Sequence, residues 1–255
     1  MSELTLTDDL TIDVSHLVTE DDTPVDNWGS EKQQRLAIKT LFTSYKRDNP
    51  FVAGVDIGIF ISPDEPAIVP DMLLSLDREL PEDWWEKHNR SYFLWKFLKP
   101  PELVIEMVSN KHGGELSRKL NKYASMGVWY YVVYDPQRLL ADEPLQVYEL
   151  RPGHFVLRDD NLLYWLDLGV TLWEGSYEGT SSTYFRFTDV DGNLLLNDEE
   201  LAQEQEMRAS VAEAQIESER GRAEAEKERA DAASDRATQL ANHLRALGID
   251  PDSIG

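Results

Sequence analysis

The sequence predicts an α/β (α+β) fold, in which a mixed β-sheet is flanked by helices and followed by antiparallel hairpins and a helical tail. Three patterns predict it: apolar strands alternate with helices up to residue 136, short strands separated by turns follow up to residue 196, and a charged heptad repeat comes last. The chain therefore divides into an acidic arm (residues 1–28), a central domain (29–197) and a charged tail (198–255).

The first part of the central domain alternates helices with apolar strands. Ser30 is the expected N-cap of its first helix, and Gly127 is the expected end of its second. The expected elements are a helix over 31–46, strands over 51–62, 67–77 and 102–109, a helix over 114–127 and a strand over 128–136. The aromatic-rich residues 80–97 fit either a helix followed by a short strand or a long ordered loop.

Short strands fill the second part of the central domain. They are expected over 145–150, 154–158, 162–167, 170–175, 184–189 and 193–196. Pro152-Gly153 and Asp191-Gly192 are turn signals between neighbouring strands. The acidic residues 1–28 are only weakly periodic, and we expect them to form a mobile or loosely docked arm.

The tail repeats every seven residues. One column holds Ala223, Ala230, Ala237 and Leu244, and the column three residues along holds Glu226, Ala233, Leu240 and Leu247. Such a thin, alanine-rich seam fits either a lone solvated helix or a coiled coil that joins copies of the chain into a homo-oligomer, such as a dimer.

Composition and charge limit the class of protein. The 255 residues include 41% hydrophobic and 10% aromatic side chains, which suits a globular core. The chain has no cysteine, no leader pattern and no apolar run long enough for a membrane helix, so we expect a cytoplasmic protein without a membrane partner. The net charge of −23 opposes nucleic-acid binding, because a polyanion meets long-range repulsion.

A carboxylate lies inside the apolar strand over 102–109. Alternate side chains of a strand share a face, so Glu106 projects from an otherwise apolar layer, where a carboxylate is costly unless it is paired. On the helix that follows, Lys119 lies at the edge of the apolar stripe. We therefore expect Lys119 to reach back along the buried surface toward this strand.

Asp71 offers a second carboxylate at the start of a neighbouring strand, directly after Pro70. Two carboxylates with a lysine nearby suit Mg²⁺ or Mn²⁺, which would polarise a phosphodiester and activate water. Each residue also has an ordinary interpretation. Glu106 fits an edge or salt-bridge residue, Lys119 a snorkelling side chain and Asp71 a turn residue.

Three stretches, "VPD", "PPELVIEMVS" and "RKLNKYASMGVWYYVVYDP", resemble the Uma2 family of bacterial endonucleases, within the PD-(D/E)XK nuclease superfamily. The resemblance extends from about residue 29 to residue 196 and implies a restriction-endonuclease-like core. It implies Asp71 and Glu106 as metal ligands, with the backbone carbonyl of Met107 as a further ligand. Val108 occupies the superfamily's lysine position, and Lys119 matches the lysine that this family carries on the following helix.

Three other residues are auxiliary candidates. The superfamily often adds a glutamate from the first helix, and Glu31 is the nearest match, although it also suits the helix N-terminus. Asp56 lies on an adjacent strand and could reach the site or serve a structural role. Ser109 follows the strand of Glu106 and could bond to backbone or hold that carboxylate.

The leading prediction is a metal-dependent endonuclease that hydrolyses DNA. Asp71 and Glu106 would hold the cation, and Lys119 would position water or stabilise the transition state. The alternative is a catalytically silent nuclease fold that binds protein partners through the acidic arm and the tail, and the net charge favours it.

Overall fold

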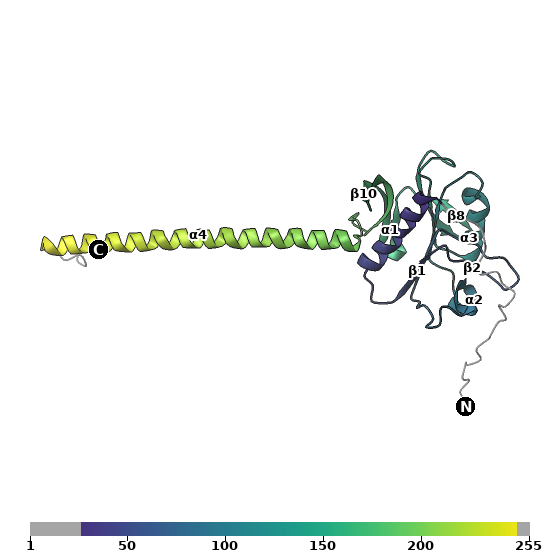
Figure 1. The fold of residues 1–255 in the computed structure, drawn as a ribbon, viewed down its shortest axis with the longest axis horizontal. Helices are drawn as coiled ribbons and strands as arrows, with labels where there is room; N and C mark the ends of the chain where they lie inside the picture. Colours follow the sequence, from purple (N-terminus) through teal and green to yellow (C-terminus); the bar gives the residue numbers. More distant parts are fainter. Residues whose placement is uncertain (1–26, 249–255) are drawn as a thin grey trace, which may run out of the picture. The chain divides into compact units, whose positions relative to one another are not determined.

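The computed structural model describes residues 27–248, and the expected acidic arm lies outside this range except for its last two residues (Figure 1). The chain divides after Asp198 into two compact units. No helix within the described range is long and apolar enough to cross a membrane.

The first unit is built on a six-stranded mixed sheet with the order β1-β3-β5-β6-β7-β8. Its strands are β1 (Phe51–Val55), β3 (Met72–Leu76), β5 (Leu103–Met107), β6 (Tyr130–Tyr134), β7 (Leu145–Arg151) and β8 (His154–Leu157). Strands β5 and β6 are parallel, and every other neighbouring pair is antiparallel. A parallel pair needs a crossover, which the helical residues between β5 and β6 provide. The predicted fold class is confirmed.

One face of this sheet is covered by helix α1 (Trp28–Ser44) and a second, three-stranded sheet (Figure 1). That sheet consists of β9 (Leu162–Leu163), β10 (Leu168–Tyr177) and β11 (Thr180–Thr188). Leu41 of α1 and Phe185 of β11 share a buried cluster with Ile105 and Met107 of β5. This face is therefore packed as an apolar core.

The opposite face is covered by helix α3 (Leu120–Met126), by the parallel pair β2 (Ile59–Phe60) and β4 (Tyr92–Phe93), and by the single turn α2 (Leu94–Phe97). Tyr123 and Phe97 share a buried cluster with Val104 of β5. Because side chains alternate along a strand, Glu106 projects on this face with Val104.

Helix α1 begins earlier than predicted. The side chain of Asn27 accepts hydrogen bonds from the backbone amides of Gly29 (2.9 Å) and Ser30 (3.1 Å), so the N-cap is Asn27 and the prediction of Ser30 was wrong. Asparagine and serine cap helices about equally well, so residue type does not separate them.

The strand predicted over 51–62 is interrupted. Asp56 has a φ of 53° and ends β1, and the chain resumes as β2, which pairs with β4 and not with the main sheet. Aspartate tolerates this left-handed backbone conformation better than most residues. The prediction of a continuous strand was wrong, because the apolar residues on both sides of Asp56 hide the break.

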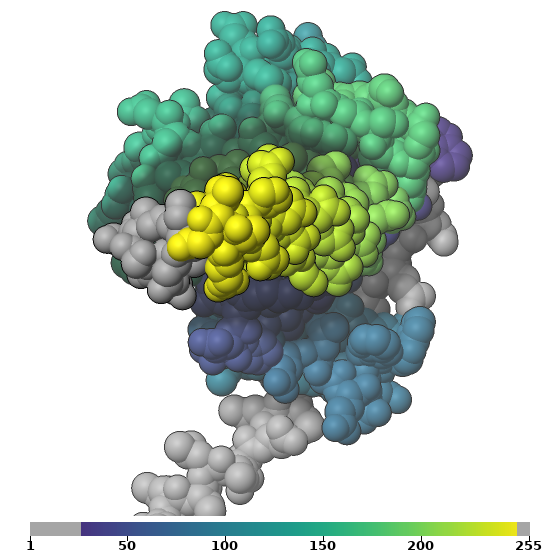
Figure 2. Space-filling model, turned by 90° about the vertical axis from the view of Figure 1, so that its left-hand side faces the viewer, coloured from purple at the N-terminus to yellow at the C-terminus, as the bar shows by residue number. Residues whose placement is uncertain are grey.

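The aromatic-rich residues 80–97 form mainly an ordered loop. A short 3₁₀ turn over Lys87–Asn89 precedes β4 and α2, so the loop interpretation is the nearer of the two. The segment lies at the surface, where it is blue in Figure 2, and Trp85 is 78% exposed.

The helix predicted over 114–127 has two parts. A π-helical turn, η2 (Glu115–Lys119), leads into α3. Gly127 ends the helix as predicted, with a φ of 86° and its backbone amide donating to the carbonyl of Ala124.

The hairpins follow the predicted order with two exceptions. Residues 162–167 give only β9 and a 3₁₀ turn over Tyr164–Leu166, and residues 193–196 form no strand. Leu194 makes a single bridge to Thr188 instead. The first predicted strand is thus shorter than expected and the second was wrong, because short apolar runs do not separate strands from turns.

The second unit consists, within the described residues, of the continuous helix α4 (Asp198–Ala246), so the tail is helical. Its 49 residues bury no side chain, and Leu240 is 64% exposed. A helix of this length extends about 74 Å. Whether copies of α4 pair remains a prediction.

Candidate active site

Glu106 lies in β5, between β3 and β6 in the middle of the sheet, and only 1% of it is exposed. Its Oε2 accepts a hydrogen bond from Lys119 Nζ at 2.6 Å, and its Oε1 accepts one from the Tyr123 hydroxyl at 2.7 Å. The predicted approach of Lys119 to this strand is thus seen directly. Tyr123 is a partner that its apolar helix position did not reveal.

The connection between β5 and α3 brings both donors to Glu106. Gly114 adopts a φ of 77°, and the amide of Lys119 then donates to its carbonyl across the π turn at 2.9 Å. Tyr123 follows Lys119 by one helical turn, so the two side chains share a face. π-Helical turns occur often at functional sites, because the wider turn redirects side chains.

Asp71 lies directly before β3 and is tied to the residue after Glu106. Its Oδ2 accepts a hydrogen bond from the backbone amide of Met107 at 2.6 Å, beyond the last ladder pair of β3 and β5. Asp71 also lies close enough to Glu106 to add electrostatic repulsion to its carboxylate. The side chain of Met107 itself belongs to the opposite core.

Burial sets the protonation of Glu106. It raises the pKa of Glu106 to about 8, against the lowering effect of Lys119 and with added repulsion from Asp71. Burial alone would lower the pKa of Lys119, but the Glu106 carboxylate outweighs it and raises that pKa overall. Burial and Glu106 also raise the pKa of Tyr123 far above its ordinary value. Lys119 and Tyr123 therefore act as proton-bearing donors.

Helix α1 contributes Gln34 to the site and not Glu31. The Gln34 side-chain amide donates to Asp71 Oδ1 at 3.1 Å and to Asp56 Oδ1 at 3.2 Å. Asp56 therefore reaches the site, whereas Glu31 pairs with Arg35 at 3.0 Å on an exposed part of the helix. The polar residue type gave no signal that Gln34 is buried.

Ser109 does not hold Glu106. Both oxygens of Glu106 are bonded to Lys119 and Tyr123, and the Ser109 hydroxyl instead accepts a hydrogen bond from Asn110 at 3.3 Å. The interpretation of Ser109 as a support for the carboxylate was therefore wrong.

The donor atoms at this site fit a hard divalent cation. Asp71 and Glu106 supply carboxylate oxygens, and each oxygen can accept more than one interaction. Residues 27–248 contain no group of three or more His, Cys, Asp or Glu side chains that could hold a metal ion. A cation here would thus use two carboxylates with backbone and water oxygens. That set suits Mg²⁺, which usually keeps several waters.

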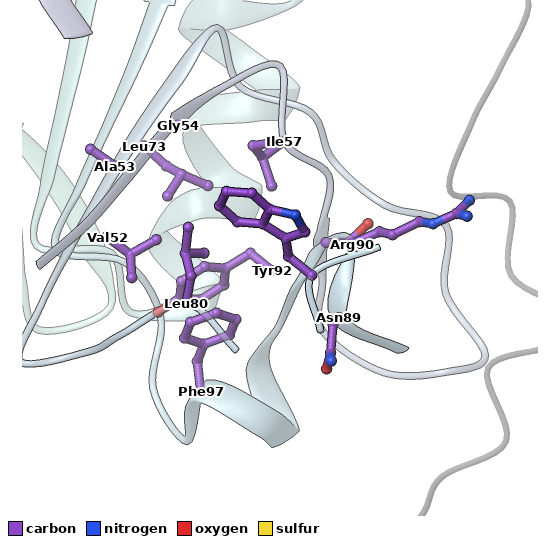
Figure 3. Close-up of a pocket in the computed structure, with 12 residues that line it drawn as sticks. Val52, Ala53, Gly54, Ile57, Leu73, Leu80, Asn89, Arg90, Tyr92 and Phe97 are labelled. Carbon is purple, nitrogen blue, oxygen red and sulfur yellow. The ribbon is translucent and has the colours of Figure 1, made fainter. Parts of the chain in front are cut away.

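An apolar pocket of about 180 Å³ opens on the same face of the sheet, along β1 and β3 (Figure 3). Tyr92 and Phe97 are stacked within it, with ring centroids 4.1 Å apart. The side chain of Arg90 points away from the pocket in Figure 3, and it bonds to the backbone of Trp85. No carboxylate lines this pocket, so it offers no anionic ligand for a cation.

Comparison with known proteins identifies the family. Residues 22–162 match the family Uma2, described as "Putative restriction endonuclease". No curated protein matches the chain. Among solved structures, the chain is similar to "a putative nuclease belonging to DUF820 from Anabaena variabilis ATCC 29413", with 15% identity and a TM-score of 0.38 over 54% of this chain and 71% of that one. The family match covers more than half of the 255 residues, and the chain therefore belongs to the Uma2 family.

Proposed function

We propose that this chain is a divalent-cation-dependent endonuclease that hydrolyses phosphodiester bonds in DNA. The contact between Glu106 and Lys119, beside the carboxylate of Asp71, carries the proposal. The Asp71 carboxylate repels the buried Glu106 carboxylate, and a bound cation would relieve that repulsion. Membership of a family described as "Putative restriction endonuclease" supports the same class of reaction.

Asp71 and Glu106 are the residues that would hold Mg²⁺ or Mn²⁺, with the Met107 carbonyl as the predicted further ligand. When bound, the cation would supply positive charge to the scissile phosphate and lower the pKa of an attacking water. The chain contributes a water-poor setting, because Glu106 is almost fully buried. Electrostatic stabilisation is strongest in such surroundings.

Lys119 supplies the second positive charge. The Glu106 carboxylate raises the pKa of Lys119, so its ammonium group keeps its protons at neutral pH. Three donors on a flexible stem allow it to contact a neighbouring carboxylate and a phosphate oxygen together. Tyr123 fixes the orientation of Glu106 through its 2.7 Å hydrogen bond, and Gln34 does the same for Asp71.

The segment that carries Lys119 is locally basic, although the chain has a net charge of −23. Residues 109–123 contain four basic side chains and one acidic side chain: Lys111, Arg118, Lys119, Lys122 and Glu115. Lys111 and Arg118 are exposed. This segment supports the approach of a DNA backbone at the site, where the repulsion of the remaining chain is locally offset.

Nicking of supercoiled plasmid tests the proposal. The purified chain should nick plasmid with Mg²⁺ and stop when the cation is chelated, and Glu106→Gln should abolish nicking while the chain stays folded. Equal nicking by wild type and variant would assign the activity to a contaminant and contradict the proposal.

A catalytically silent scaffold is the second candidate. The net charge favours it, and so do the internal hydrogen bonds that already engage both oxygens of Glu106 and Asp71. In this case α4 would bind a protein partner or a second copy of the chain. Mg²⁺ would not raise the melting temperature, and Leu240→Asp with Leu244→Asp would change the oligomeric state in a light-scattering measurement.

A further inference from the structure

Glu115, the first residue of η2, is buried close to the site but has no part in the mechanism above. It is 6% exposed, and its Oε1 lies 3.7 Å from Lys119 Nζ, too far for a hydrogen bond. Its Oε2 has no hydrogen-bond partner among residues 27–248. A buried carboxylate oxygen without a partner is costly, so its retention needs a reason.

The chain around Glu115 fixes the carboxylate in this position. Tyr131 donates a hydrogen bond to its backbone carbonyl at 3.1 Å. A Cβ atom on Gly113 would lie 1.7 Å from Glu115 Oε1, so any larger residue at position 113 would displace the carboxylate from its present place. Gly114 supplies the turn, with a φ of 77°. The neighbouring residues thus hold the backbone of Glu115, and Gly113 leaves the space that its carboxylate occupies.

Lys119 lies between two carboxylates. Its Nζ is 2.6 Å from Glu106 Oε2 and 3.7 Å from Glu115 Oε1. Glu115 and Lys119 are four residues apart and share one side of the helix. A displacement of the ammonium group by about 1 Å would bring it into hydrogen-bond range of Glu115, and the flexible lysine stem permits such a displacement.

We propose that Glu115 is a positioning residue that becomes the partner of Lys119 when a divalent cation occupies Glu106. The inference rests on the proposed function. A cation and an ammonium group compete for the same carboxylate, and Glu115 gives the displaced ammonium group a buried anionic partner. Lys119 then stays beside the scissile phosphate and no longer opposes cation binding.

A direct ligand role for Glu115 is the rival explanation, and the geometry disfavours it. The described part of the chain holds no cluster of three such side chains able to bind a metal. The two explanations differ in whether the effect of Glu115 on the cation passes through Lys119.

A double-mutant cycle on Mn²⁺ affinity, measured by calorimetry, separates them. The chains are wild type, Glu115→Gln, Lys119→Met and the double variant. Glu115→Gln should weaken Mn²⁺ binding on the order of tenfold when Lys119 is present, and less than about twofold in the Lys119→Met background. Glu65→Gln is the matched control, because Glu65 pairs with Lys122 on the same helix. It should leave the affinity unchanged.

Thermal melts confirm that each variant is folded. Glu115→Asp keeps the negative charge on a shorter side chain and replaces Glu115→Gln in the cycle if that variant unfolds. It should lower the Mn²⁺ affinity less than Glu115→Gln, and this loss must also require Lys119. An equal loss of Mn²⁺ affinity in both backgrounds would make Glu115 a direct ligand, and no loss of affinity would make it a structural residue. Either result overturns this inference but not the proposed function. Absence of Mn²⁺ binding by the wild-type chain would overturn the proposed function, and this inference with it.

Discussion

Two buried glutamates lie near the two ends of β5, Glu102 directly before the strand and Glu106 inside it, and each is paired with a lysine. Glu102 Oε1 lies 2.5 Å from Lys99 Nζ, as Glu106 Oε2 lies 2.6 Å from Lys119 Nζ. The other oxygen of Glu102, however, accepts a hydrogen bond from the backbone amide of Leu76 at 2.9 Å. Glu102 thus fastens the end of β3, and its contacts account for its burial.

Glu106 differs in its remaining partners. Both oxygens of Glu106 accept hydrogen bonds from side chains only, and the carboxylate of Asp71 adds electrostatic repulsion to Glu106. A buried carboxylate–lysine pair is therefore not a sufficient sign of a site. A neighbouring carboxylate and the lack of a backbone anchor separate the candidate site from the structural pair.

Substitution of the two lysines in turn should give the largest difference between the two pairs, measured as the rate of plasmid nicking. Lys119→Met should lower the rate of Mg²⁺-dependent plasmid nicking by about 100-fold or more, because a charge aimed at the transition state is lost. Lys99→Met should keep the nicking rate of the folded protein, measured at matched folded concentration. Equal losses in the two variants would remove the distinction between the pairs.

For stability, in contrast to the nicking rate, substitution of Glu102 should have a larger effect than substitution of Glu106. Glu102→Ala should lower the free energy of unfolding by about 3 kcal/mol, because it leaves Lys99 and the Leu76 amide without their partner. Glu106→Gln should change it by less than about 1 kcal/mol at pH 7, since Glu106, with a pKa of about 8, is mostly protonated there and glutamine is neutral and of similar shape. Urea unfolding measures both, and a larger loss for Glu106→Gln would reverse the assignment.

The pH dependence of stability should belong to Glu106. Its folded-state pKa of about 8 lies above the ordinary value of 4.5, so between these pH values the folded chain holds a proton that the unfolded chain has released. Its contribution to stability is therefore complete below pH 4.5 and is lost as pH rises through about 8. The free energy of unfolding of the wild-type chain should therefore fall as pH rises across this range. Glu106→Gln should abolish this fall, and Glu102→Gln should keep it.

The two tyrosines next to these pairs should give the smallest effect. Tyr123→Phe removes the hydrogen bond to Glu106 and should slow nicking by several-fold, equivalent to about 1 kcal/mol. Tyr92→Phe removes the hydrogen bonds to Ser75 and to the Lys99 carbonyl. It should lower the melting temperature without changing the nicking rate; a change in that rate would show that the two ends of β5 are coupled.

Strong apolar runs made the centre of the fold predictable. Residues 102–109 and 128–136 gave β5 and β6, and the helical spacing placed Lys119 on the side of Glu106. The break at Asp56 was not predictable, because its backbone conformation depends on the tertiary course of the chain and not on a turn sequence.

The supporting residues of the site were hidden for a different reason. Gln34 and Glu115 are polar residues in helical segments, and such residues are usually solvated or interact with the helix dipole. Only the packing of α1 and η2 against the sheet shows that both are buried. Tyr123 was visible as an apolar position, but its hydroxyl partner lies on another element.

The most direct measurement of the central claim is the anomalous diffraction of crystals soaked in Mn²⁺. The proposed function predicts one strong anomalous peak in contact with both Asp71 and Glu106, and no peak at Glu102. A peak that touches neither Asp71 nor Glu106, or no peak at a concentration that supports nicking, would contradict it.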